Sequence, residues 1–254
     1  MSGRIEAVLV CGGSWHDFDY ARVHLLTELA AHPRVRTRVY QDYDCLAALS
    51  EAEVLITYTC NAVPSAEQRR ALTAFVTGGG RWLALHGTNS AIEPLGADRF
   101  ATPRRLGELA RVLGSRFLGH PPIGPYRVEI TEPDHPLVRG LAPFEVTDEL
   151  YISELHPPLH VLAHTRYVGD APGFEQGRTT VDEPRPVLYL KESGAGTVCY
   201  LTLGHCRGRF DLQDLGVDDL GFVDRGSWEV NGYRTILRRC LDWAVTAEFP
   251  DPDG

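Results

Sequence analysis

The chain has 254 residues, of which 43% are hydrophobic and 23% are charged, so it is long enough to bury a sizeable core and disorder is not expected beyond its ends. The formal net charge of −9 argues against non-specific binding to nucleic acid or to an anionic membrane, because both need a basic protein face. The six cysteines lie far apart without a CxxC pair, no secretory segment precedes the first strand, and no apolar run approaches the ~18 residues of a membrane span. We therefore expect a reduced, cytoplasmic protein that has neither nucleic acid nor membrane as a partner.

Strand-like and helical patterns alternate in the first part of the chain. Compact apolar runs and apolar–polar alternation predict the strands, and apolar residues at helical spacing predict the helices. The strands are expected at residues 5–11, 35–40, 53–58 and 82–85, and the helices at residues 20–31 and 64–77. This order predicts a parallel sheet that is covered by helices on both faces.

The pattern is looser beyond residue 86. Further helices are expected at residues 104–113 and 233–245, and further strands at residues 126–131, 161–163 and 187–190, whereas residues 144–151 mix apolar and acidic residues. Neither an internal repeat nor a linker separates these parts. We therefore expect a single domain over residues 1–254, in which the region 115–185 elaborates one side.

Two stretches of the sequence share one plan, in which a glycine turn precedes a short apolar strand that ends at a Gly–His pair. The first, residues 78–90, carries His86 beside Gly87, and the second, residues 194–205, ends at His205. Functional groups of open α/β sheets gather at the carboxyl ends of strands, so these histidines are expected at one sheet edge. A histidine there can act as an acid, a base or a metal ligand.

Other candidate residues stand in loops or at strand ends. His16 and His120 follow glycine-rich or strand-end segments, where loops often carry function. Asp148 and Glu149 are the expected acidic partners, and if their segment is extended, at most one of them faces the site, because adjacent residues on a strand point to opposite faces. Structural histidines and a solvated acidic loop are the alternative interpretation.

Several known motifs are absent from the sequence. It contains neither a Gly-x-Ser-x-Gly nor a Gly-x-Cys-x-Gly elbow, no Gly-x-Gly-x-x-Gly follows the first strand, and no Gly-Lys-Ser/Thr phosphate loop occurs. A nucleotide cofactor is therefore not expected.

Several segments follow one another in an order and spacing that are typical of one family. They are Leu85-His86-Gly87, the stretch from Gly114 through Phe117 to His120-Pro121, Asp134-His135-Pro136-Leu137, Asp148-Glu149-Leu150-Tyr151, and the stretch from Gly194 to His205. On these segments the chain resembles the ThuA-like (trehalose utilisation) family, within the class I glutamine amidotransferase-like superfamily.

The resemblance implies an α/β fold, a flavodoxin-like three-layer α/β/α sandwich with a mostly parallel central sheet. It also implies that His86 lies at or beside the position of the nucleophilic cysteine of glutamine amidotransferases, and that His205 is the counterpart of their catalytic histidine. Cys206 stands where an acidic triad partner is expected. Because no cysteine occupies the nucleophile position, glutamine hydrolysis by a thiolate is not supported.

The family is associated with disaccharide use, including routes through 3-keto sugars, and this implies carbohydrate metabolism. The first hypothesis is an enzyme, of hydrolase, lyase or isomerase type, that acts on a sugar, a disaccharide or a 3-keto-glycoside. His86 and His205 would be its acid and base groups, assisted by Asp148 or Glu149. The substrate-binding residues would be Trp15, His16, Asn89, His120 and Tyr151.

Two alternatives to this hypothesis stay open. One is a non-catalytic sugar-binding or regulatory module, and the other is a hydrolase in which the histidines and a carboxylate bind a divalent metal. No cofactor follows with certainty from the sequence, although a divalent metal is compatible with it. The expected partner is a small-molecule sugar, and self-association into a homo-oligomer is left open.

Overall fold

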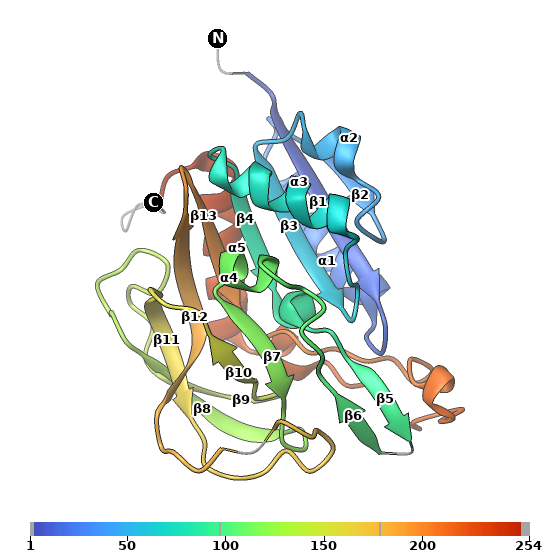
Figure 1. Ribbon diagram of the computed structural model, residues 1–254. Helices are drawn as coiled ribbons and strands as arrows, with labels where there is room; N and C mark the ends of the chain where they lie inside the picture. Colours follow the sequence, from blue (N-terminus) through green and yellow to red (C-terminus); the bar gives the residue numbers. More distant parts are fainter. Residues whose placement is uncertain (1–2, 97, 178, 250–254) are drawn as a thin grey trace.

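The protein is organised around one sheet of nine strands, seen in a computed structural model that describes residues 3–96, 98–177 and 179–249 (Figure 1). Its strands are β1 (Ile5–Gly13), β2 (Val35–Tyr40), β3 (Val54–Cys60), β4 (Arg81–Leu85), β8 (Gly124–Ile130), β9 (Phe144–Asp148), β11 (His160–Arg166), β12 (Pro184–Ser193) and β13 (Gly196–Leu201). They lie side by side in the order β2-β1-β3-β4-β13-β12-β11-β8-β9. Two small two-stranded sheets flank this one, β5 (Glu93–Gly96) with β6 (Arg99–Ala101) and β7 (Ser115–Gly119) with β10 (Ile152–Leu155).

The large sheet is parallel in one half and antiparallel in the other. Strands β2, β1, β3, β4 and β13 pair in parallel, whereas β12, β11, β8 and β9 continue the sheet with antiparallel pairs. The expected α/β class is confirmed, but the expectation of a mostly parallel sheet is wrong, because the sheet is mixed. The turn Gly194-Ala195 shows the physical reason, since a two-residue turn can join antiparallel strands only and a parallel pair needs a long crossover.

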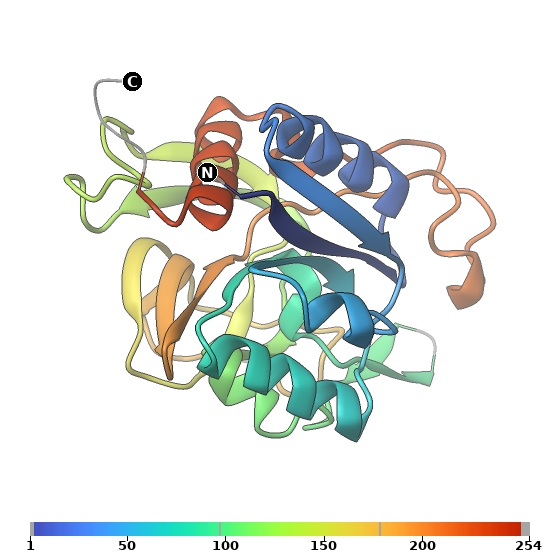
Figure 2. The ribbon, with the colours of Figure 1, turned by 90° about the horizontal axis from the view of Figure 1, so that it is seen from above.

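Helices cover both faces of this sheet. They are α1 (Phe18–Ala30), α2 (Leu46–Leu49), α3 (Ala66–Thr77), α4 (Leu109–Leu113) and α5 (Asn231–Thr246). Helices α1 and α5 pack on one face and α2, α3 and α4 on the other, as the view from above shows (Figure 2). A hydrophobic core lies on each face of the sheet, and alternate residues of β4 belong to different cores. Leu83 and Leu85 pack on the α1–α5 side, and Trp82 and Ala84 pack on the other.

Local sequence signals explain where these helices begin and end. Ser65 caps α3, accepting a hydrogen bond from the backbone of Gln68 while the Gln68 side chain bonds back to Ser65. The helix expected over residues 104–113 is shorter, because Gly107 has a positive φ of 56° and α4 begins only at Leu109. None of the helices in the described ranges is long and apolar enough to cross a membrane.

We expect the substitution Leu83→Ala to lower the free energy of unfolding by about 2–5 kcal/mol, because Leu83 is fully buried and its truncation leaves a cavity at the centre of the sheet. Urea denaturation followed by circular dichroism measures this change. Val23 is 63% exposed, so the control Val23→Ala should stay within about 0.5 kcal/mol of the wild type. An equal effect of the two substitutions would contradict the central position of β4.

Candidate functional site

Four buried side chains come together at the carboxyl-terminal edge of the parallel strands. His16 follows β1, His86 follows β4, His205 follows β13, and Glu149 follows β9 of the antiparallel half. His86 begins a short 3-10 helix, η1 (His86–Asn89), and has a positive φ of 46°, a conformation that non-glycine residues adopt rarely and often at functional sites. We call these four residues the histidine–glutamate cluster.

The ring nitrogens and carboxylate oxygens of the histidine–glutamate cluster converge on one point. His16 Nε2 lies 2.9 Å from His86 Nε2 and 3.3 Å from His205 Nδ1. Glu149 closes the group, with Oε1 3.1 Å from His205 Nδ1 and Oε2 3.3 Å from His86 Nε2. One ligand atom from each residue lies within 4.8 Å of all the others, so the group can hold a metal ion.

In two of these histidines, the hydrogen bond of the outer ring nitrogen determines which nitrogen is protonated. His16 Nδ1 lies 3.1 Å from the Ser14 carbonyl oxygen, and His86 Nδ1 lies 2.9 Å from that of Thr202. A carbonyl oxygen can only accept, so each Nδ1 is the protonated nitrogen and each neutral ring turns an Nε2 lone pair inward. Two lone pairs 2.9 Å apart repel each other unless a cation or an additional proton lies with them.

The charges within the cluster are set by burial and by the neighbours. Burial alone would raise the pKa of Glu149, but the nearby His120 and His205 hold it well below its usual value, so the carboxylate is ionised. Burial would lower the pKa of His86, yet hydrogen bonding and attraction to Glu149 raise it above the usual value. For His16, burial and repulsion by His86 lower the pKa well below the usual value, which leaves that ring neutral. An anionic oxygen and a neutral imidazole are thus held together in a site that favours a cation.

Asp148 has a different role from its neighbour. Its carboxylate accepts hydrogen bonds from the backbone N–H groups of Glu149 at 2.7 Å, Gly204 at 3.1 Å, His205 at 3.2 Å and Ser227 at 3.0 Å. It therefore ties the end of β9 to the segment after β13 and to the 3-10 helix η3 (Gly226–Glu229). Asp148 positions His205, while Glu149 is the acidic residue that faces the other three members of the cluster.

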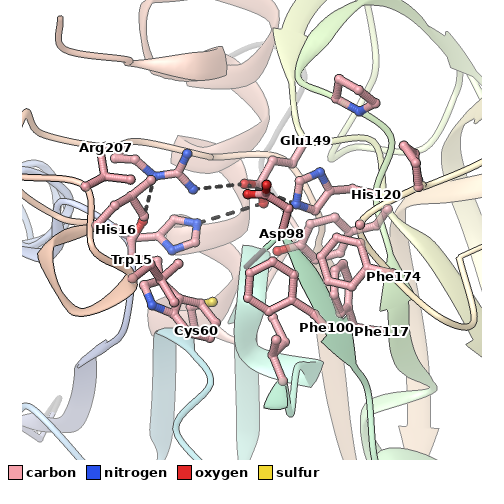
Figure 3. Close-up of a pocket in the computed structure, with 18 of the residues that line it drawn as sticks. Trp15, His16, Cys60, Asp98, Phe100, Phe117, His120, Glu149, Phe174 and Arg207 are labelled. Atoms are coloured by element: carbon pink, nitrogen blue, oxygen red, sulfur yellow. Dashed lines mark hydrogen bonds and ion pairs between the residues drawn. The ribbon is translucent and has the colours of Figure 1, made fainter. Parts of the chain in front are cut away.

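A cavity of about 400 Å³ lies against the histidine–glutamate cluster (Figure 3). His16 and Glu149 line it, together with three other residues that we expected in a pocket, Trp15, His120 and Tyr151. His86 and His205 complete the cluster and are 1% and 0% exposed.

Asn89, which we also expected to bind substrate, points elsewhere. Its side-chain amide donates a hydrogen bond of 2.6 Å to Ser115 Oγ inside the core, and its backbone N–H donates one of 2.9 Å to the Tyr200 hydroxyl. These bonds hold the end of η1 against β7 and β13, which is a structural role.

Sequence reasoning missed Arg207, which lines the cavity. Its Nη2 lies 3.4 Å from Glu149 Oε1, and its Nε donates to the Trp15 carbonyl oxygen at 2.9 Å. Its position two residues after His205, in the same strand-end loop, was a usable signal. Phe100, Phe117 and Phe174 were also missed, because an isolated phenylalanine has the same appearance in a sequence whether it lines a pocket or fills a core.

The cysteines near the site do not have the properties of a nucleophile. Burial raises the pKa of Cys60, which lines the cavity, to about 12. Burial likewise raises the pKa of Cys206 to about 12, and this thiol lies 3.2 Å from the Tyr58 hydroxyl. Both are therefore protonated thiols at neutral pH.

One family model matches most of the chain, and solved structures share its fold. The family model described as ThuA, trehalose utilisation, matches residues 7–215. A ThuA-like protein from Parabacteroides merdae ATCC 43184 has a TM-score of 0.68 at 16% identity, with 98% of this chain and 92% of that chain covered. One from Bacteroides uniformis ATCC 8492 has a TM-score of 0.63 at 17% identity, with coverages of 98% and 96%.

A more distant likeness is to a β-galactosidase from Rahnella sp. R3, with a TM-score of 0.50 at 16% identity. The alignment covers 84% of this chain and 31% of that chain, and it shows a shared fold alone. A comparison with curated proteins finds no match.

We expect Asp148→Asn to lower the free energy of unfolding by about 2–4 kcal/mol, because the amide has one acceptor oxygen and its NH₂ group would face backbone donors. Chemical denaturation measures this loss. Asp134 is exposed, so Asp134→Asn is the matched control and should be neutral. A neutral Asp148→Asn would show that these hydrogen bonds do not hold the loops in place.

Proposed function

The chain belongs to the ThuA (trehalose utilisation) family, and on this premise we propose that it is a carbohydrate enzyme whose reaction depends on a metal ion held by the histidine–glutamate cluster. The observation that carries the proposal is the convergence of the four possible ligand atoms within 4.8 Å, with two Nε2 atoms 2.9 Å apart. A cation bound there would remove the repulsion between the inward-facing lone pairs of His16 and His86 and would neutralise the buried Glu149 carboxylate.

The donor set supports a first-row transition metal ion. Imidazole nitrogens suit zinc, iron, copper and nickel, and a carboxylate oxygen completes such sites. The carbonyl oxygens of Ser14 and Thr202 accept hydrogen bonds from the outer N–H groups of His16 and His86, and metal-bound histidines usually donate their other ring N–H in the same way. The cluster also adjoins the cavity through His16 and Glu149, and such access is what separates catalytic from purely structural metal sites.

A bound metal ion would supply Lewis acidity toward an oxygen atom of the sugar. In this proposal His86 and His205 are ligands, since both are almost completely buried within the cluster, and they leave the acid–base role to another group. His120 fits that role, because it lines the cavity, its side chain is 22% exposed, and its Nε2 lies 3.6 Å from Glu149 Oε1. Its Nδ1 lies 2.7 Å from the Pro121 carbonyl oxygen, so Nε2 is the nitrogen that can exchange a proton with the substrate.

Arg207 contributes positive charge at the same end of the cavity. Its guanidinium is held by the Trp15 carbonyl oxygen and by Glu149, and it can donate a hydrogen bond to a substrate oxygen. With His120 it forms the polar wall that would orient a sugar above the cluster.

A second candidate is acid–base chemistry on a sugar without a metal. The raised pKa of His86, which attraction to Glu149 maintains against burial, favours it, because a proton can then occupy the place of the cation. Elemental analysis separates the two mechanisms.

We expect purified wild-type protein to contain about one transition metal ion per chain, as measured by plasma mass spectrometry. His86→Ala and Glu149→Ala should each weaken metal binding on the order of a hundredfold, since each removes one of four ligands. His160→Ala is the control, because His160 pairs with Glu132 on the surface and should leave the metal content unchanged. Metal-free wild type that neither binds zinc, manganese or iron nor gains thermal stability from them would reject the metal mechanism.

We further expect His120→Asn to reduce turnover by on the order of 10²-fold while the metal content stays the same, because proton transfer is lost but no ligand is removed. Turnover is measured by product release from a panel of nitrophenyl glycosides and their 3-keto derivatives. His164→Asn, at a partly buried histidine on β11, is the control. An unchanged rate in His120→Asn would exclude this residue as the acid–base group.

A further inference from the structure

The cavity beside the histidine–glutamate cluster has a polar end and an apolar end, which meet at His120, whose ring centroid lies 5.0 Å from that of Phe174. Glu149 lies between His16 and Arg207 on one side and His120 on the other, and these four residues form the polar end (Figure 3). The other charged side chain among the described lining residues is that of Asp98, which is exposed to solvent. Polar recognition of a ligand is therefore concentrated next to the cluster.

Aromatic rings form a continuous wall along the rest of the cavity. Phe174 lies 5.4 Å from Phe117 and 5.6 Å from Phe100, measured between ring centroids, and Trp15 lies 6.0 Å from Phe100. We call Phe100, Phe117 and Phe174 the phenylalanine wall. The remaining surface is mostly aliphatic or proline, from Ile92, Pro122, Pro172, Leu212, Leu215 and Val217.

The phenylalanine wall is held in place by the backbone. Phe100 N–H donates to the Gly173 carbonyl oxygen at 2.8 Å, and Glu175 N–H donates to the Phe100 carbonyl oxygen at 3.1 Å, so β6 and the segment with Phe174 are tied together. A Cβ atom at Gly119 would lie 2.8 Å from Phe174 Cβ, which shows that the absence of a side chain at Gly119 makes room for the ring. The wall is thus pre-formed and does not need a ligand to assemble it.

These two ends suit a ligand with one polar and one apolar part. A second sugar ring could stack its C–H face on the phenylalanine wall, but its hydroxyl groups would be buried among aromatic and aliphatic side chains that offer them no hydrogen-bond partners. An aromatic or hydrocarbon group in the same place would lose apolar surface from water and stack against the rings. The volume of about 400 Å³ suits a monosaccharide with a substituent of one or two aromatic rings.

We propose that the ligand of this cavity is a glycoside with a single sugar ring at the histidine–glutamate cluster and an apolar, aromatic-type aglycone against the phenylalanine wall. The inference rests on the proposed function, since it takes the polar part of the ligand to be a sugar. It adds that an unsubstituted disaccharide binds more weakly than such a glycoside.

Binding to the metal-loaded, full-length protein tests the proposal by isothermal titration. The panel contains the methyl, phenyl and naphthyl glycosides of glucose and galactose, both anomers of each, and the 3-keto form of each glycoside. Trehalose and cellobiose represent unsubstituted disaccharides, and phenol and naphthol represent the free aglycones. We expect the best aryl glycoside to bind at least roughly tenfold more tightly than the methyl glycoside of the same sugar and than either disaccharide.

Substitutions in the phenylalanine wall should remove this preference. In Phe174→Ala the aryl glycoside should lose on the order of tenfold in affinity, and the methyl glycoside should be unaffected. Phe174→Leu, which keeps an apolar side chain, should retain part of the preference and guards against an effect of misfolding. Phe222→Ala is the control, because Phe222 is 59% exposed.

The outcomes separate this inference from the proposed function. A disaccharide that binds as tightly as the best aryl glycoside, or an aryl preference that survives in Phe174→Ala, overturns the inference and leaves the sugar enzyme standing. If phenol or naphthol binds as tightly as the corresponding glycoside, the cavity does not recognise a sugar, and the proposed function is overturned as well. No binding by any member of the panel overturns both.

Discussion

The arrangement of the site depends on one buried carboxylate that accepts four backbone hydrogen bonds. Asp148 lies at the end of β9, the outermost strand of the antiparallel half, and its oxygens bind N–H groups of the segments that follow β13 and form η3. Since a buried carboxylate is costly without such donors, the chain can satisfy Asp148 only by bringing these segments to β9. Once they meet, Glu149 and His205 are neighbours.

Because of this contact, both halves of the mixed sheet contribute side chains to the site. The parallel half ends in three histidines at one edge, as parallel strands allow, but it contributes no carboxylate to the group of four. The antiparallel half contributes Glu149, whose negative charge holds the pKa of His86 up and whose own pKa is held down by His120 and His205. Each half supplies what the other lacks for the binding of a cation.

The sequence was most informative where a short local pattern determines structure. A glycine turn and an apolar run precede both His86 and His205. The two apolar runs are neighbouring parallel strands that end at the same edge of the sheet. The expectation that only one of Asp148 and Glu149 faces the site agrees with the structure, although β9 ends at Asp148 and Glu149 lies just beyond it. The pairing of strands that are distant in the sequence could not be predicted. The direction of the strands in the region 124–166 depends on how their connections pack rather than on the strands themselves. The pocket role of Arg207 and the inward turn of Asn89 depend on neighbours that are distant in the chain, at Trp15 and Ser115.

The place of β13 in the sheet also constrains the order of folding. In the described sheet β13 is the last strand in sequence, yet it lies between β4 and β12 and joins the parallel half to the antiparallel half. His16 and His205, whose ring nitrogens are 3.3 Å apart, are separated by 189 positions in the chain. Contacts of such long range form slowly, because the loop must be closed before the contact is made. During synthesis, neither the continuous sheet nor the complete histidine–glutamate cluster can exist until residue 205 has left the ribosome, so a partly made chain cannot present all four side chains together.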